Sequence, residues 1–253
     1  MITVLLTALG VGGATAVGAL IGFLFKNPSQ KFSDVILSFA AGIMLCASIV
    51  GLIIPSVEGC GGGINIIIPV LGIVIGALSL NLMDKLVPHA HKLLGADNEK
   101  HPERSARINK VILFVMAIAI HNLPEGIAAG VSFGTGNDAH AISVASGIAL
   151  QNIPEGMIVI APMIAAGMSK KRTLVIALCT GLVEVIGTLM GYFAVSISVA
   201  ILPFALAFAG GTMIYVISDE MIPETHSHGF ERSATYALIM GFVVMLIFDY
   251  FLG

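Results

Sequence analysis

Two hexapeptides of the chain carry side chains that can bind metal ions. His121-Asn122-Leu123-Pro124-Glu125-Gly126 is followed 30 residues later by Gln151-Asn152-Ile153-Pro154-Glu155-Gly156. In a helix, the first and fifth positions of each hexapeptide share one face, so imidazole or amide lies beside carboxylate. Each proline removes an N–H and frees a backbone carbonyl of the preceding turn. The two segments therefore present carboxylate, amide, imidazole and carbonyl groups on two kinked helices.

A third carboxylate, Glu184, lies in another apolar segment of the chain. The apolar segments that contain Glu125, Glu155 and Glu184 have no Lys or Arg that could pair with these acids. An ionisable residue in the bilayer core costs roughly 2.5–3.5 kcal/mol on insertion scales. The carboxylates therefore need protons, water or bound cations. Oxygen and nitrogen donors without thiolate suit Zn²⁺, Fe²⁺, Mn²⁺, Cd²⁺ or Co²⁺ and disfavour Cu(I). We expect a midmembrane site for one or two divalent cations. A hydrogen-bonded core with protonated Glu is the structural alternative.

The composition places these residues in a membrane. Of 253 residues, 57% are hydrophobic and 11% are charged, and the mean hydropathy is +1.00. Such a chain cannot supply the polar surface of a soluble enzyme or of a nucleic-acid-binding protein. The three cysteines form no CxxC pair, which argues against a disulfide framework or a thiolate metal site. We predict an all-α membrane protein that forms a single transmembrane domain in the lipid bilayer and has no nucleic-acid partner.

Eight apolar runs are long enough to cross a bilayer as helices. All 12 Lys and Arg residues fall in four alternate connections between these runs. The positive-inside rule places those connections in the cytoplasm and both termini outside. The predicted spans cover residues 2–25, 35–57, 64–83, 111–133, 141–166, 173–195, 201–218 and 234–248, with a cytoplasmic loop over 84–110.

A fainter repeat relates the outer spans. Gly18–Phe23 resembles Gly187–Tyr192, and Phe39–Met44 resembles Phe208–Met213, both at an offset of 169 residues. Five spans separate the equivalent helices, and because this number is odd the two halves are inverted. The pattern predicts spans one to three and six to eight as inverted repeats around a central pair, a 3+2+3 arrangement. Transporters built in this way bind their substrates near the midplane of the membrane.

Further polar residues lie at the ends of the predicted spans. Glu58, Asp138 and His140 are expected on the outer side, where they would attract cations. On the inner side, a metal release site is expected at the end of span seven, and transient metal capture in the long loop. An ordinary polar helix end and a solvated loop are the respective alternatives. The exit-side residues are Asp219, Glu220, Glu224, His226 and His228, and the loop residues are His89, His91 and His101.

HNLPEG, QNIPEG, the span-six carboxylate and the stretch GTMIYVISDEMIPE resemble the ZIP (Zrt/Irt-like) family of divalent metal transporters, most closely its prokaryotic GufA-type branch. The resemblance covers all eight spans. It implies a binuclear centre between spans four, five and six, outward termini, the 3+2+3 repeat, elevator-type movement of a four-helix bundle and, in many members, a homodimer. It also implies movement of a divalent metal, zinc foremost, into the cytoplasm across a prokaryotic inner (plasma) membrane. The metal is then the substrate, and no catalytic cofactor is expected.

By position, the resemblance assigns seven metal-binding residues to this chain. Many members have His-Glu-x-Pro-His-Glu in span five, whereas here Gln and Asn stand in the first two positions and Glu and Gly in the last two. The centre therefore contains a single histidine, which bears on metal preference and on the occupancy of both metal positions. The assigned residues are His121, Asn122, Glu125, Gln151, Asn152, Glu155 and Glu184.

Three other functional classes are weighed against a transporter. A passive cation channel would use the same residues, but tight multidentate ligation slows release, and conduction needs weak sites. An intramembrane metalloenzyme would need HExxH or an equivalent motif, and the sequence contains no HExxH. A purely structural membrane protein would bind no metal at all. We therefore expect a divalent metal transporter that is not an enzyme.

Overall fold

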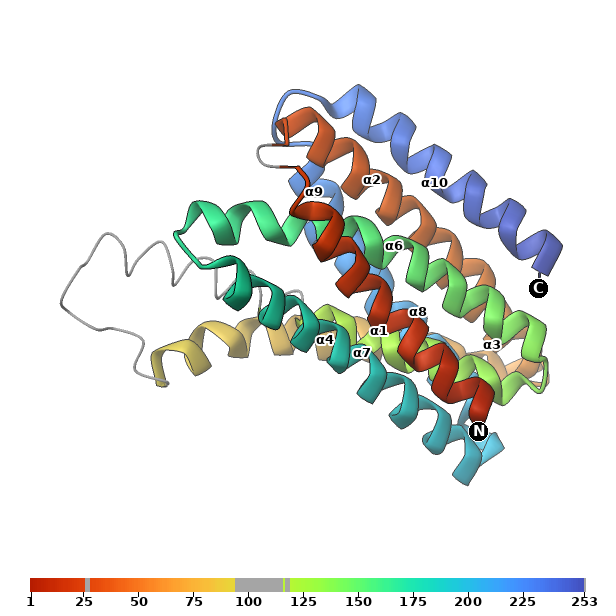
Figure 1. Cartoon of the computed structure of the whole chain (residues 1–253). Coiled ribbons are helices and arrows are strands. Elements are labelled where there is room, and N and C mark those ends of the chain that lie inside the picture. Colours follow the sequence, from red (N-terminus) through yellow and green to blue (C-terminus); the bar gives the residue numbers. More distant parts are fainter. Residues whose placement is uncertain (26–27, 94–115, 117–118, 253) are drawn as a thin grey trace.

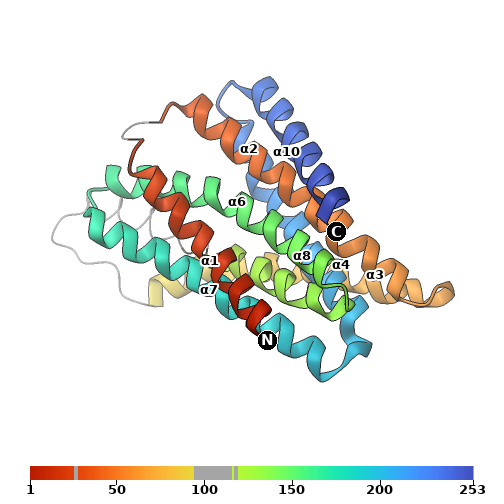
Figure 2. The same cartoon turned by 45° about the vertical axis from the view of Figure 1, so that its right-hand side comes forward.

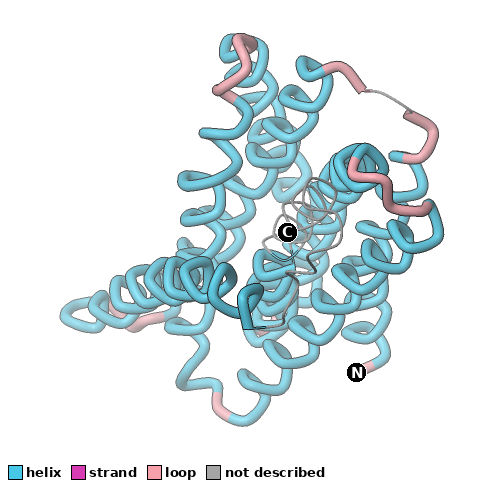
Figure 3. The backbone as a smooth tube through the Cα atoms, turned by 90° about the vertical axis from the view of Figure 1, so that its left-hand side faces the viewer, coloured by secondary structure: helices cyan, strands magenta, loops and turns pink. Residues whose placement is uncertain are grey.

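A computed structural model describes residues 1–25, 28–93, 116 and 119–252 of the chain. These residues form helices joined by short turns, and Figure 3 shows no strand among them. Backbone N–H and C=O groups find no water in a bilayer core, and a helix satisfies them within one segment. The prediction of an all-helical membrane protein is thus confirmed for the described residues.

Seven helical segments of the described part are long and apolar enough to cross a membrane. A further helix over residues 119–132 carries the first hexapeptide, and the start of predicted span 111–133 lies outside the described residues. Short 3₁₀ or π-helical turns interrupt or flank several segments. The elements are α1 (Ile2–Gly22), α2 (Gln30–Cys46), η1 (Ala47–Ile53), α3 (Ile54–Gly59), η2 (Gly63–Ile66), α4 (Ile67–Leu93), η3 (Phe133–Thr135), α6 (Asp138–Ala165), α7 (Lys170–Ile197), η4 (Val199–Ile201), α8 (Leu202–Val216), η5 (Ile217–Met221), α9 (Ile222–Thr225) and α10 (Glu231–Leu252).

Several boundaries differ from the sequence prediction by a few residues, and two of them differ by seven residues or more. The α4 helix continues to Leu93, so part of the predicted loop 84–110 is helical. Span seven, predicted to end at residue 218, continues through η5 and α9 to Thr225. Hydropathy marks the end of an apolar run, and a helix can continue beyond that run into the polar region.

Three of the long helices begin at a residue whose side chain caps the helix. The side-chain oxygens of Ser29, Asn137 and Ser169 accept hydrogen bonds from backbone N–H groups in the first turns of α2, α6 and α7. Such caps satisfy donors that have no partner within the helix, and each typically contributes about 1 kcal/mol. The caps fix where the helices that carry the second hexapeptide and Glu184 begin.

The helices pack in two groups (Figures 1 and 2). In the first group, α1 packs against α6 and α7, and α7 also packs against the helix over 119–132. In the second group, α2 pairs with α10 and α4 pairs with α8. Both termini lie at one end of the molecule, and the α6–α7 and α9–α10 turns lie at the other end (Figures 1 and 2).

Within the first group, helices meet where a glycine lies against a backbone carbonyl of its neighbour. A Cβ added at Gly18 would collide with the carbonyl oxygen of Ile153, and one at Gly187 would lie 2.5 Å from that of Leu123. Only glycine permits so close an approach, which is how membrane helices commonly pack. The first group is therefore held together backbone against backbone.

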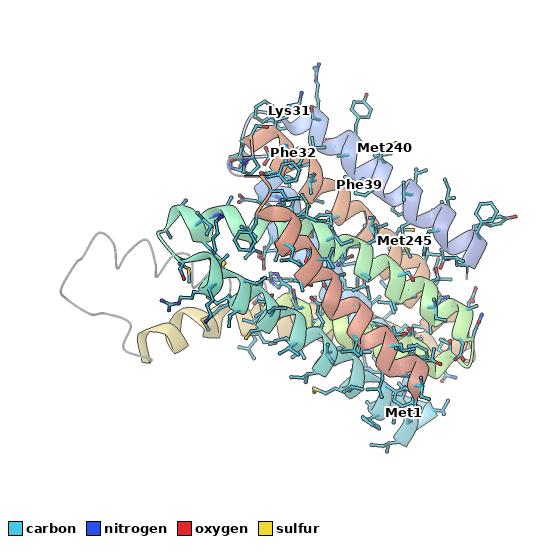
Figure 4. The ribbon with its side chains drawn as sticks, viewed as in Figure 1. Met1, Lys31, Phe32, Phe39, Met240 and Met245 are labelled. Atoms are coloured by element: carbon cyan, nitrogen blue, oxygen red, sulfur yellow. The ribbon has the colours of Figure 1, made fainter. Side chains whose placement is uncertain are left out.

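The contact between the two groups, here called the seam, joins α6 to α2, η1 and α10 and has a different character. A Cβ added at Gly147 would lie 2.5 Å from the sulfur of Met245, and one at Gly51 would lie 2.7 Å from a methyl group of Val144. Met245 is buried, while Met240 on the same helix is exposed (Figure 4). At the seam, glycines therefore face side chains rather than backbone.

Candidate metal centre

The two hexapeptides meet at one carboxylate, that of Glu184 in the middle of α7. The Nδ2 of Asn122 donates a hydrogen bond to Oε1 at 2.5 Å, and the Nδ2 of Asn152 donates to Oε2 at 2.6 Å. The hydroxyl of Thr15 in α1 also donates to Oε1, at 2.8 Å. All four side chains are buried. The structure thus gathers three of the predicted site residues and adds Thr15.

The glycine that ends each hexapeptide explains how these side chains come within reach. A Cβ at Gly126 would collide with the carbonyl oxygen of Glu184, and a Cβ at Gly156 would collide with that of Thr15. Each glycine lets its helix lie directly on the backbone of α7 or α1. The short asparagine side chains can then span the remaining distance to the carboxylate.

A cavity of about 500 Å³ extends from the hexapeptides toward the end of the molecule that carries the α9–α10 turn. His121, Glu125 and Glu155 line its inner part, and Glu220 and the exposed Glu224 line its outer part. The cavity therefore connects the centre to one end of the molecule. The other predicted ligands, which are buried beside this cavity, are Asn122, Gln151, Asn152 and Glu184.

Several buried side-chain oxygen and nitrogen atoms of the centre, which could bind a metal ion, have no hydrogen-bond partner among the residues that the structure describes. They are the Oδ1 atoms of Asn122 and Asn152, together with the carboxylate oxygens of Glu125 and the amide of Gln151, which interact with each other without a well-formed hydrogen bond. Leaving a buried polar group unsatisfied costs about 1–3 kcal/mol, and more for a charged group. Oxygen donors of this kind fit a hard or borderline divalent cation. The side chains present thus suit the predicted substrate.

The predicted ligands do not surround a common point in the structure. Among the described residues, no three His, Cys, Asp or Glu side chains lie close enough together to hold a metal ion. The Nε2 of His121 lies 2.7 Å from Oε1 of Glu220, and both side chains line the cavity. Coordination of one ion by His121, Glu125 and Glu155 would require these three side chains to come closer together. The sequence did not predict the contact between His121 and Glu220.

The predicted exit-side residues divide into two sets. Asp219, Glu220 and Glu224 line the cavity. His226 instead faces α10, because its Nε2 lies 3.1 Å from Oγ1 of Thr235. The carboxylates of this end thus share the cavity of the centre, and His226 does not.

His228 belongs to a separate polar cluster at the start of α2. Its Nδ1 lies 3.2 Å from Oδ1 of the buried Asp34 and 3.1 Å from Nε2 of Gln30. Its Nε2 lies 4.0 Å from Oε1 of Glu224. This cluster ties the α9–α10 turn to α2 beside the mouth of the cavity.

The loop histidines are not tested by the structure. His89 and His91 fall within the helical range of α4, but their side chains lie outside the described residues. His101 lies outside the described residues altogether.

The end of the molecule that carries the termini has a cavity of its own, of about 410 Å³, lined in part by Glu58. Asp138 is exposed in the first turn of α6. The Nε2 of His140 lies 3.0 Å from the carbonyl oxygen of Gly51 in η1, across the seam. None of the predicted central ligands lines this second cavity.

Sequence reasoning missed three polar residues within the helices: Thr15, Asp34 and Asp249. Asp249 accepts a hydrogen bond from the hydroxyl of Ser143 at 3.0 Å, across the seam. The two aspartates lie near helix ends, where a carboxylate is common. Thr15 is neutral, but it precedes Glu184 by 169 residues, which is the offset of the peptide repeat. That equivalence was the available signal.

The helices, the cavity and the unsatisfied buried oxygens define a multi-pass membrane protein with a polar centre suited to divalent cations. A family model described as ZIP zinc transporter matches residues 88–249. The chain belongs to the ZIP family, as the two hexapeptides predicted.

Relatives match over nearly the whole chain. It is 42% identical to the zinc transporter GufA of Myxococcus xanthus over 98% of each chain. It is 40% identical to the zinc transporter ZIPB of Bordetella bronchiseptica, over 95% of this chain and 78% of that protein. It is 32% identical to the zinc transporter ZIP11 of Homo sapiens, over 95% and 94% of the two chains. The predicted GufA-type branch is thus confirmed.

Proposed function

We propose that the chain carries divalent metal cations, with Zn²⁺ as the main substrate, through the membrane into the cytoplasm. The observation that carries this proposal is the set of buried, unsatisfied oxygens beside a cavity that His121, Glu125 and Glu155 line. The predicted spans contain no Lys or Arg that could replace a cation there. The names of the relatives support zinc. The proposed centre consists of His121, Asn122, Glu125, Gln151, Asn152, Glu155 and Glu184.

The proposed topology has eight spans, with both termini outside and the α6–α7 and α9–α10 turns in the cytoplasm. Lys171 and Arg232 lie at the ends of helices next to these two turns, which supports this orientation. The central cavity reaches the same end. In this topology the structure is an inward-facing state, from which metal leaves past Glu220 and Glu224.

The proposed 3+2+3 repeat is supported by contacts that recur at the offsets of the sequence repeats. Gly156 lies against Thr15 as Gly126 lies against Glu184. The glycines differ by 30 residues and their partners by 169, which are the offsets of the two sequence repeats. Helices that correspond to each other in the repeats therefore contact neighbouring helices that also correspond to each other.

The proposed movement is an elevator-type shift of the first helix group along the second. The seam supports this mechanism, because its glycines face side chains, which can repack, while the first group is joined backbone to backbone. Glu125 and Glu155 are equivalent residues of the two hexapeptides, so we propose them as the bridging ligands if two ions bind.

The remaining features of the proposal come from the family. Zinc transport is not an enzymatic activity, so we propose no catalytic role and no catalytic cofactor. GufA and ZIPB are bacterial proteins, which supports the proposal that this chain lies in a prokaryotic inner membrane. The homodimer that the resemblance implies stays a prediction.

Uptake by purified protein in liposomes tests the function. The panel contains Zn²⁺, Fe²⁺, Mn²⁺, Cd²⁺ and Co²⁺, and protein-free liposomes serve as the control. We expect slow, saturable uptake with Zn²⁺ among the best substrates. Fast, weakly saturating flux would indicate a channel instead. Uptake of none of these ions would contradict the proposal.

Labelling of single cysteines in intact cells tests the topology. Each cysteine is introduced into a variant in which Cys46, Cys60 and Cys179 are replaced. We expect Glu58→Cys and Asp138→Cys to react with an impermeant maleimide from outside, because both residues are exposed at the end that carries the termini. His226→Cys and Arg104→Cys should react only after permeabilisation. Labelling of the 88–107 segment from outside would disprove the eight-span topology.

A further inference from the structure

We propose that Gln30, Asp34 and His228 form a second binding site for a divalent cation of the zinc type, outside the metal centre, at the end of the molecule where the central cavity opens. In the proposed topology this end is cytoplasmic, so the site takes ions that have left the cavity. The site goes beyond the proposed function, because none of its three residues belongs to the centre that carries the transported ion.

The site lies where the start of α2 meets the α9–α10 turn (Figures 1 and 2). Three side-chain atoms form a nearly equilateral triangle there. The Nε2 of Gln30 lies 2.9 Å from Oδ1 of Asp34 and 3.1 Å from Nδ1 of His228, and Nδ1 lies 3.2 Å from Oδ1. Tetrahedral ligands of Zn²⁺, each at about 2.0–2.2 Å from the ion, are about 3.3–3.6 Å apart. The triangle is therefore only slightly smaller than a zinc site.

Hydrogen bonds alone do not satisfy this triangle while Asp34 is ionised. An imidazole nitrogen carries either a proton or a lone pair, and a carboxylate oxygen only accepts. With a proton, Nδ1 of His228 donates to Asp34, but it then faces the NH₂ group of Gln30, which is also a donor. With a lone pair, Nδ1 accepts from Gln30, but it then faces the carboxylate oxygen, which is also an acceptor. In either state, two groups of the same kind are in contact.

A cation resolves this conflict. Half a turn of the Gln30 amide places Oε1 where Nε2 lies, and the two atoms have nearly the same size. A carboxylate oxygen, an amide oxygen and an imidazole nitrogen then all direct lone pairs at one ion. Because one of the donors is an imidazole nitrogen, the site suits Zn²⁺ or Co²⁺ rather than Mg²⁺ or Ca²⁺, which prefer oxygen ligands.

The burial of Asp34 points independently to a ligand. The residue is only 2% exposed, and its Oδ2 is buried without a hydrogen-bond partner among the described residues. No described Lys or Arg forms an ion pair with it, and a buried charge without compensation is costly. The hydroxyl of Ser38, one turn further along the same face of α2, is also buried without a described partner. The inner wall of the site thus holds polar atoms that still lack partners.

The site is accessible from the cavity and from solution. The Nε2 of His228 lies 3.3 Å from Oγ of Ser227 and 4.0 Å from Oε1 of Glu224, and these two residues line the cavity. Gln30 and His228 are exposed. The imidazole thus lies between the mouth of the cavity and Asp34, so an ion that leaves past Glu224 meets His228 next.

Calorimetric titration of purified protein in detergent with Zn²⁺ tests this second site. The titration uses a background variant in which Glu125, Glu155 and the three loop histidines are replaced by alanine. We expect this background to retain a Zn²⁺ site that Asp34→Asn and His228→Ala each weaken about 10-fold or more, since even outer-shell changes at metal sites cost that much. The matched control is Glu231→Gln, which neutralises an exposed carboxylate in the first turn of α10 and should leave the affinity unchanged.

Unchanged Zn²⁺ affinity in either Asp34→Asn or His228→Ala would overturn the inference. If only His228→Ala weakened binding, the ion would be held by an exposed histidine alone. An excess of Mg²⁺ should not displace Zn²⁺, and displacement would contradict the assigned class of cation. Size-exclusion profiles monitor folding, and His228→Ala and Gln30→Ala, both at exposed positions, carry the test if Asp34→Asn does not fold.

The two proposals fail separately. Absence of metal uptake by the wild-type protein would contradict the proposed function and leave this second site in place, because the background variant already lacks the central carboxylates. Normal uptake by the wild type, together with a background whose Zn²⁺ binding is absent or insensitive to Asp34→Asn, would overturn this inference alone.

Discussion

Glu125→Ala and Glu155→Ala should each abolish metal uptake while the protein still inserts into the membrane. Each change removes a carboxylate that lines the cavity, and Glu184, which is already part of the proposed centre, cannot supply a second one. We expect a loss of about 100-fold or more, since even outer-shell changes at metal sites cost 10–100-fold. Insertion should not suffer, because removing a midmembrane carboxylate lowers its cost. The measurement is initial uptake rate per inserted protein.

Two controls accompany this prediction. Glu231→Ala removes an exposed carboxylate from the first turn of α10 and should leave the uptake rate near that of the wild type. Joint replacement of His89, His91 and His101 should lower the rate only modestly. Near-normal uptake by Glu125→Ala, or complete loss of uptake in the triple histidine variant, would show that the centre lies elsewhere.

Gly156→Ala should impair both stability and transport. The added Cβ would collide with the carbonyl oxygen of Thr15, which is backbone and cannot move aside like a flexible side chain. Forcing extra atoms into a packed contact typically costs about 1–3 kcal/mol. The displacement of α6 from α1 also draws Asn152 away from Glu184, so metal affinity should fall as well. Thermal unfolding in detergent and uptake rate are the two measurements.

Gly13→Ala in α1 is the matched control for this glycine. A Cβ at Gly13 would have no neighbouring atom within 4 Å. Alanine is favoured over glycine inside a helix by roughly 1 kcal/mol, so this variant should be at least as stable as the wild type. If Gly156→Ala unfolded at the wild-type temperature and transported normally, the close contact between α1 and α6 would be wrong.

Most of the helical architecture could be predicted because few backbone structures satisfy their hydrogen bonds within lipid. A helix satisfies its own backbone, so apolar runs reveal the positions of the spans. The extension of α4 to Leu93 was not predicted, since a helix outside an apolar run has no hydropathy signal. The continuation of span seven to Thr225 was not predicted for the same reason.

The candidate site was predictable where its residues share a helix and not where they meet across helices. The spacing of His121 and Glu125 follows from helical geometry alone. The contact of His121 with Glu220, by contrast, joins residues of different helices. No local pattern encodes such a pair. The partnership of Thr15 with Glu184 was foreshadowed by the 169-residue offset, but a hydroxyl in an apolar run gives no sign of its acceptor.

The two kinds of glycine contact give the molecule an uneven stiffness. Where glycine meets carbonyl, as at Gly18 and Gly156, no side chain can yield, so the first helix group is stiff. Where glycine meets methionine, as at Gly147, an unbranched and adaptable side chain takes up strain. Mechanical compliance is thus concentrated in the seam rather than in the backbone contacts that join the helices of the metal centre. A bilayer of different thickness stresses a membrane protein by fractions of a kcal/mol per Å of mismatch. That stress would be absorbed by sliding at the seam, while the distances between metal ligands stay the same.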